Sequence, residues 1–128
     1  MNLQRVWWAL GVVLVAVALL VCLAPVEDIA ASFEWNDKAS HLIGHGTLAL
    51  YFAGLVPRRS WWKIFVFLLV MGIGVEFAQY YMHWGREGDP RDVVANSIGA
   101  LLGLTAGRLG GARWPELVAW LLGRRATQ

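Results

Sequence analysis

The chain has 128 residues, which is the length of one domain, and 58% of them are hydrophobic against 16% charged. With a mean hydropathy of +0.51 and a formal net charge of +2, this composition excludes an ordinary water-soluble globule. Its long apolar stretches are therefore candidate membrane spans. The single cysteine, Cys22, excludes a disulfide framework within one chain.

The first predicted element is a membrane-spanning helix over residues 6–24. This unbroken apolar run of 19 residues ends at Pro25. At about 1.5 Å per residue it is about 28 Å long, close to the hydrocarbon thickness of a bilayer. A cleaved signal peptide is the alternative, but the run is longer than the roughly 7–15 apolar residues of such peptides. We therefore expect a retained helix.

Three more spans are predicted over residues 39–57, 61–82 and 93–109, joined by short loops. A stretch at 115–122 is too short to span. It has proline at its first helical position and paired arginines after it, so it is predicted to be an interfacial helix. All eight tryptophans fall at or just beyond an end of a proposed span, where an amphipathic indole ring belongs. The sequence thus predicts one all-α domain, a four-transmembrane-helix bundle with a short C-terminal interfacial helix.

The basic residues predict the orientation of these spans. Eight lie on one side: Arg5, Arg58, Arg59, Lys63, Arg108, Arg113, Arg124 and Arg125. Three lie on the other: Lys38, Arg86 and Arg91. By the positive-inside rule, both termini and the middle loop are expected in the cytoplasm. The basic charge is therefore a topology signal with membrane lipid as the expected partner, and it does not indicate nucleic acid.

Polar residues form a stripe on the second predicted span. Asp37, His41 and His45 are spaced i, i+4, i+8, so they share one helix face. Lys38 precedes His41 by three residues and joins that face. The stripe lies at the end of the span that is expected to face away from the cytoplasm.

The third and fourth spans carry stripes of their own. Glu76, Gln79 and His83 are spaced i, i+3, i+7 on one helix, and Asp92 and Asn96 are spaced i, i+4 on the next. Because helix direction alternates, all three stripes are expected at the same, extracytoplasmic end.

The cost of placing charge in a membrane predicts what the stripes form. A charged residue at a helix centre costs from about 2.5–3.5 kcal/mol upward, so such residues face the bundle interior or a wet cavity. We therefore expect a polar pocket, open outward, between the second, third and fourth spans. Its candidate residues are Asp37, Lys38, His41, His45, Glu76, Gln79, Arg86, Asp92 and Asn96.

Small residues continue the stripe of the fourth span. Gly99, Gly103 and Gly107 repeat every four residues on one face, a pattern that lets helix backbones approach closely in a membrane. Packing within the chain is the favoured interpretation, and a homo-oligomer stays open.

Four motifs carry a family resemblance: DKASH (Asp37–His41), EFAQ (Glu76–Gln79), a following Arg86, and DVVANSIGALLG (Asp92–Gly103). In order and spacing they resemble the VanZ-like family of small polytopic bacterial membrane proteins, over about half of the chain. The resemblance implies a bacterial plasma-membrane protein and places the arginine over the pocket, but it does not supply a reaction. One residue departs from the family pattern: His45 stands where a tyrosine is expected.

Several functions fit these residues. The favoured one is a pocket that binds an envelope lipid, glycan or peptide-like ligand, with no cofactor and no metal. The alternative without a ligand is that these residues form a purely structural network of polar contacts between helices. The alternative is a membrane-embedded enzyme that acts on a lipid-linked envelope substrate, with His41, Glu76 and Asp92 as acid and base groups.

Two further functions rank lower. A metal site is one, built from His41 and His45 with Glu76 or Asp92. Transport is the other, and it is disfavoured because the polar stripes stop at mid-membrane.

Overall fold

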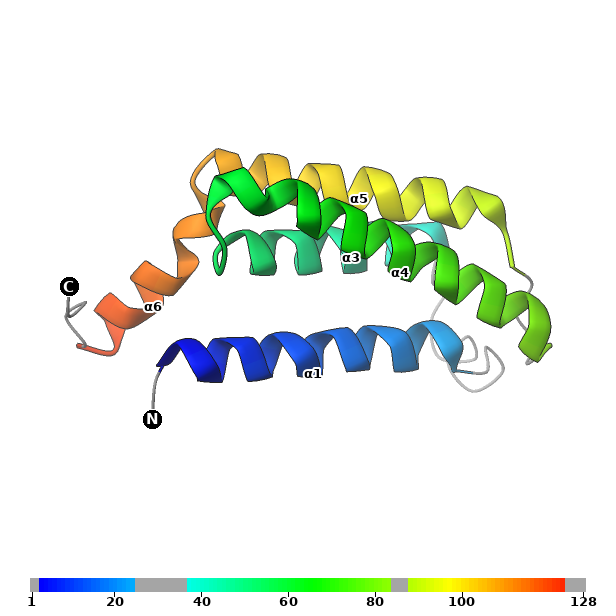
Figure 1. Cartoon of the computed structure of the whole chain (residues 1–128), viewed down its shortest axis with the longest axis horizontal. Helices are drawn as coiled ribbons and strands as arrows, with labels where there is room; N and C mark the ends of the chain where they lie inside the picture. The colour runs from blue at the N-terminus through cyan, green and yellow to red at the C-terminus, as the bar shows by residue number, and fades with distance from the viewer. Residues whose placement is uncertain (1–2, 25–36, 84–87, 124–128) are drawn as a thin grey trace.

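The computed structural model describes residues 3–24, 37–83 and 88–123, and it is all-α (Figure 1). The helices are α1 (Leu3–Leu23), α3 (Asp37–Ala53), α4 (Trp61–Met82), α5 (Pro90–Arg108) and α6 (Trp114–Leu121). Two 3₁₀ turns, η1 (Arg58–Ser60) and η2 (Gly111–Arg113), precede α4 and α6.

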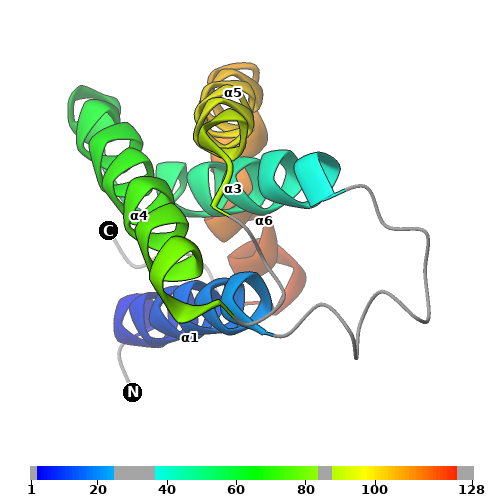
Figure 2. The ribbon, with the colours of Figure 1, turned by 90° about the vertical axis from the view of Figure 1, so that its right-hand side faces the viewer.

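The four long helices run along one axis in alternating directions. In both views α1 lies on one side of the molecule and α5 on the opposite side, with α3 between them, and α4 runs obliquely from the level of α5 to that of α1 (Figures 1 and 2). The start of α1, the end of α3, the start of α4 and the end of α5 share one end, where α6 also lies. The end of α1, the start of α3, the end of α4 and the start of α5 share the other, which we call the polar end.

Not every predicted span is long and apolar enough to cross a membrane by itself. Two segments are, α1 and the 25 residues from Arg58 to Met82. Helix α5 qualifies only together with α6, to which it is bent by 70°. The structure therefore gives two or three candidate spans among the described residues, and the predicted four-span bundle is not established by helix length and composition.

The predicted span over residues 39–57 corresponds to the shorter helix α3, which has 17 residues and ends at Ala53. The backbone N–H groups of Gly54 and Leu55 donate to the carbonyls of Tyr51 and Phe52. The indole N–H of Trp114 donates to the Tyr51 carbonyl as well, at 3.1 Å. The helix thus ends where a side chain from α6 donates a hydrogen bond to one of its last carbonyl groups.

Glycines bring the backbones of α3 and α5 into direct contact. A methyl group added at Gly99 would collide with the carbonyl oxygen of Leu42, and one at Gly103 with that of Gly46. Gly107, one turn further, lies against Ala53. Such close approach gains dispersion energy along the whole contact. The stripe of glycines in α5 is thus used inside the chain.

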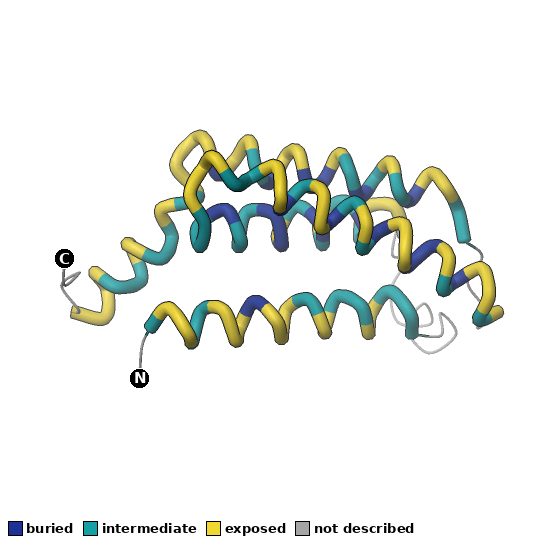
Figure 3. Tube along the Cα trace, viewed as in Figure 1, coloured by how far each residue is buried: buried dark blue, intermediate teal, exposed yellow. Residues whose placement is uncertain are grey.

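The buried residues of the structure lie mainly on α3, α4 and α5 (Figure 3). Ala49, Leu68 and Ala100, one from each of these helices, are almost completely buried. In α1 only Gly11 is buried, and most of its apolar side chains are exposed. A helix that is apolar all round yet exposed is typical of one that faces lipid.

Helix α1 is attached to the rest of the bundle at both of its ends. Near its start, the Tyr51 hydroxyl donates to the Trp7 carbonyl at 2.6 Å. Near its end, the Gln79 amide donates to the Cys22 carbonyl at 2.8 Å. Between α1 and α4 lies an apolar cavity of about 510 Å³, which Val12 and Phe67 help to line.

We predict that Gly103→Leu destabilises the bundle. The new side chain has no room against Gly46, so α3 and α5 must separate, and overpacking of this kind typically costs about 1–3 kcal/mol. The thermal unfolding of detergent-solubilised protein measures the loss.

Gly74→Leu in α4 is the matched control, because nothing lies within 4 Å of a side-chain carbon added there. It is expected to leave the melting temperature unchanged or raise it, since leucine favours helix over glycine by roughly 0.5–1 kcal/mol. Equal melting temperatures for the two variants would contradict the packing described above.

Candidate functional site

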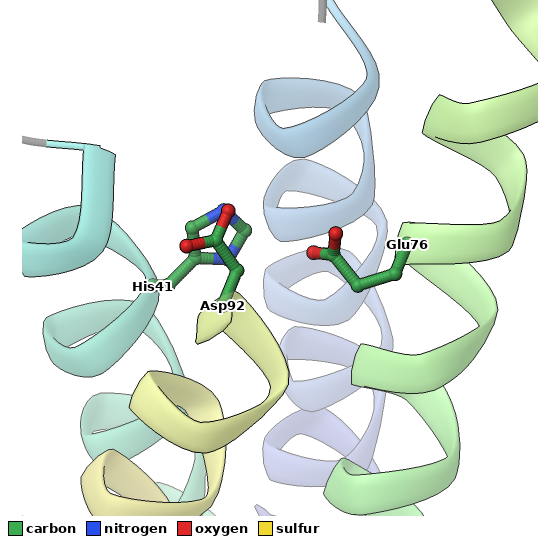
Figure 4. A group of neighbouring side chains, drawn as sticks. All are labelled: His41, Glu76 and Asp92. Carbon is green, nitrogen blue, oxygen red and sulfur yellow. The ribbon is translucent and has the colours of Figure 1, made fainter. Parts of the chain in front are cut away.

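Three helices bring ionisable side chains together at the polar end. His41 comes from α3, Glu76 from α4 and Asp92 from α5, and one ligand atom of each lies within 4.8 Å of the others. The side chain of Glu76 points toward the facing pair of His41 and Asp92 (Figure 4). All three are buried, with exposed fractions of 3%, 8% and 2%. We call this group the His–Glu–Asp cluster.

The N-terminus of α5 positions Asp92. Asp89 is the N-cap of this helix, and its carboxylate accepts a hydrogen bond from the backbone N–H of Arg91 at 2.9 Å. Pro90 follows at the first helical position, where a proline is favoured. Asp92 thereby falls in the first turn, where the helix dipole stabilises a negative charge.

Lys38 joins the start of α3 to the start of α5. Its ammonium donates to Asp89 Oδ2 at 3.1 Å and to Asp92 Oδ1 at 3.3 Å. Asp92 is buried, whereas the side chains of Lys38 and Asp89 are about half exposed. The lysine thus places a positive charge at the solvent-exposed edge of the cluster.

His41 is held by residues on both sides of its ring. Its Nδ1 lies 3.1 Å from Asn96 Oδ1, and its Nε2 lies 3.6 Å from Asp92 Oδ2. Asn96 is only 1% exposed. It fits because the facing residue of α4 is Gly72, where an added carbon would lie 2.8 Å from the Asn96 amide nitrogen.

Glu76 is oriented by the segment that leads into α5. Its Oε2 accepts a hydrogen bond from the backbone N–H of Asp89 at 2.8 Å. Gly88 permits this approach, because a carbon added there would lie 2.7 Å from the Glu76 carbonyl oxygen. A backbone donor therefore holds the carboxylate in place from outside the cluster.

Of the four remaining candidate residues, the structure places two, Gln79 and His45, outside the cluster. Gln79 is buried and donates to the end of α1. His45 is buried one turn below His41, and its Nε2 makes no hydrogen bond with the described residues. Arg86 lies outside the described residues, and so does the side chain of Asp37, the first residue of α3.

Three residues of this site, Gly72, Gly88 and Asp89, are not among the candidates predicted from the sequence. Asp89 has a local signal, since an aspartate followed by proline is a typical helix start. Gly72 and Gly88 carry none, because their role is to leave room for side chains or backbone distant in sequence.

The pKa of Asp89 is lowered in the folded protein. The backbone N–H of Arg91, and then the ammonium of Lys38, hold it below its ordinary value of 3.8. Asp89 is therefore negatively charged throughout the physiological range.

A groove of about 460 Å³ adjoins the cluster between α3 and α5. Apolar side chains, among them Leu42, Val94 and Ile98, form most of its lining. Lys38 and Arg91 line the same groove. We call it the α3–α5 groove.

The fold and the site define a helical membrane protein with a buried polar cluster where three of its helices meet. The family model of VanZ/LLP1 matches residues 12–110. The chain therefore belongs to the VanZ/LLP1 family, as its motifs predict. Comparison with curated proteins and with solved structures gives no significant match.

We predict that charge at Asp89 stabilises the polar end in a pH-dependent way. Because the pKa of Asp89 is lower in the folded protein, its contribution is present above the unfolded value and is lost as pH falls through the folded one. Asp89→Asn keeps a helix-capping side chain but removes the charge. Its melting temperature should be below that of the wild type at pH 7, and the difference should shrink as pH falls below 3.8.

Glu116→Gln is the control for this measurement. Glu116 is an exposed acid of α6 that pairs with Arg113 at 3.3 Å, and such surface pairs contribute little to stability. A difference between wild type and Asp89→Asn that stays constant from pH 7 to pH 3 would rule out the charge as its cause.

Proposed function

We propose that the chain is a four-span protein of the bacterial plasma membrane with both termini in the cytoplasm. The alternating directions of α1, α3, α4 and α5 support this topology, and so does the excess of lysine and arginine at the ends opposite the polar end. Helix α3 is short and only moderately apolar, but it lies among α1, α4 and α5. At 17 residues it measures about 26 Å, within reach of a thin hydrocarbon layer.

Labelling of single cysteines tests this topology in a Cys22→Ser background. A cysteine at Asn36 should react with a membrane-impermeant maleimide in intact cells, because this residue directly precedes in sequence the start of α3, which lies at the polar end. A cysteine at Arg59 should react only after the membrane is permeabilised. Equal labelling of both positions in intact cells would refute the four-span arrangement.

In this proposal the polar end binds a phosphate-bearing envelope lipid of the outer leaflet. The observation that carries it is the α3–α5 groove, which combines an apolar lining with two cations, Lys38 and Arg91. A glycan or a polar peptide has little apolar surface to bury against such a lining, whereas a lipid chain is apolar along its length. Among the ligands that the sequence leaves open, the lipid therefore fits best.

The two parts of such a ligand would have different partners. Its chain would lie along Leu42, Val94 and Ile98 in the groove. Its phosphate would be bound by Arg91, which is exposed in the first turn of α5. Arginine suits this role because its planar guanidinium donates two parallel hydrogen bonds to a phosphate.

The test is mass spectrometry of the lipids that co-purify with the protein. Arg91→Glu, which repels a phosphate, is expected to lower the bound anionic lipid roughly tenfold, since a hydrogen bond to a charged group contributes about 1.5–3 kcal/mol. Ala39→Trp, which fills the groove, is expected to lower the bound lipid by about the same factor. Arg108→Glu and Ala106→Trp are the matched controls at the other end of α5, and they should retain wild-type lipid.

Equal lipid in the wild type and in all four variants would refute binding in the groove. A second function, catalysis, is favoured by the burial of His41 beside two carboxylates. If the wild type chemically converts an added lipid-linked precursor and His41→Ala does not, the polar end is an active site.

A further inference from the structure

The His–Glu–Asp cluster has the composition and spacing of a metal site. We propose that His41, Glu76 and Asp92 bind one divalent transition-metal ion, with one imidazole nitrogen and two carboxylate oxygens as ligands. This inference goes beyond lipid binding and does not depend on it, because the cluster is buried among three helices whereas the groove lies on the outer side of α3 and α5.

The distances between the candidate ligand atoms suit an ion. At metal–ligand distances of about 2.0–2.2 Å, the ligand atoms of a tetrahedral or octahedral site lie roughly 3–3.5 Å from their neighbours. His41 Nε2 and Asp92 Oδ2 are already 3.6 Å apart. The whole group spans no more than 4.8 Å, so small side-chain movements complete the site.

Contacts around the cluster resemble the outer shell of a metal site. A histidine ligand characteristically donates its second ring N–H to an oxygen, which fixes the tautomer. Nδ1 of His41 has an oxygen of this kind beside it, Asn96 Oδ1 at 3.1 Å. With the proton on Nδ1, Nε2 is the ring nitrogen that binds a metal ion, and a cation there also balances the buried negative charge of Asp92.

Both carboxylates are oriented from outside the cluster as well. Lys38 holds Asp92 Oδ1 at 3.3 Å, and the backbone N–H of Asp89 holds Glu76 Oε2 at 2.8 Å. Ligand carboxylates are commonly fixed by hydrogen bonds of this kind. Every residue of the cluster therefore has its position set by a neighbour that is not a ligand.

The donor set selects the class of metal. Magnesium and calcium prefer sites made of oxygen alone, and copper(I) prefers sulfur, whereas a mixed imidazole and carboxylate set suits zinc, manganese or iron. Three protein ligands leave coordination positions open for water or a phosphate oxygen, as in catalytic zinc sites.

This site differs from the one weighed from the sequence, which paired His41 with His45. Those histidines are one turn apart on α3, but His45 is not in the group that the three helices form. The second and third ligands instead come from α4 and α5. Spacing within one helix cannot reveal such a set.

Metal analysis of protein purified without chelators tests the proposal. We expect about one zinc, manganese or iron ion per chain in the wild type, and at least a fivefold loss in Asp92→Asn and in Glu76→Gln. His83→Asn is the matched control, because His83 is exposed outside the cluster and its φ of 50° is one that asparagine tolerates. It should keep the wild-type metal content.

Titration of metal-free wild type with Co²⁺ makes the test independent of how the variants fold. Binding at one imidazole and two carboxylates should produce visible ligand-field bands at one equivalent, and Zn²⁺ should displace them. Absence of these bands would overturn the proposal, and so would metal retained in both cluster variants.

A positively charged side chain is the competing occupant, and Arg86, one of the predicted pocket residues, is the candidate. If the wild type holds no metal and Arg86→Ala lowers its melting temperature while creating Co²⁺ binding, the cluster is an ion-pair network and not a metal site. Lipid co-purification is measured separately, so failure of the metal site and failure of lipid binding can be told apart.

Discussion

The contact between the backbones of α3 and α5 is the constraint on which the rest of the structure depends. Gly99 and Gly103 allow carbonyl groups of α3 to touch α5 directly. At that separation, side chains one or two turns nearer the polar end must meet, which places His41 against Asn96 and Lys38 against Asp92. A bulky residue in the glycine stripe would therefore disturb the polar end as well as the packing.

Helix α4 completes the site by fitting around what α3 and α5 have formed. Gly72 leaves space for the amide of Asn96, and Gly88 lets the chain pass close to Glu76 on its way into α5. Some of the buried polar groups are bonded by neighbours from other segments, as His41 is by Asn96 and Glu76 by the backbone N–H of Asp89. The polar end is thus specified by contacts between helices, and no single helix carries it.

Much of this architecture can be predicted from periodicity. Four apolar segments, the tryptophans at their ends and the family motifs indicate a helical membrane protein, and the i, i+4 spacings place His41 and Asp92 on interior faces. The end of α3 could not be predicted, because it depends on Trp114 from a distant helix. The same holds for Gly72 and Gly88, whose importance lies in the absence of a side chain, and for the separation of His45 from the cluster.

Beside its contacts with α3, helix α1 borders an apolar hollow on the side of α4. In a bilayer, hydrocarbon tails from surrounding lipids would occupy that hollow and support the helix along its length. Solubilisation in a micelle replaces those tails with shorter, more loosely ordered ones. The choice of amphiphile for purification should therefore govern how firmly the first helix stays docked, and through Gln79 it also bears on the helix that supplies Glu76.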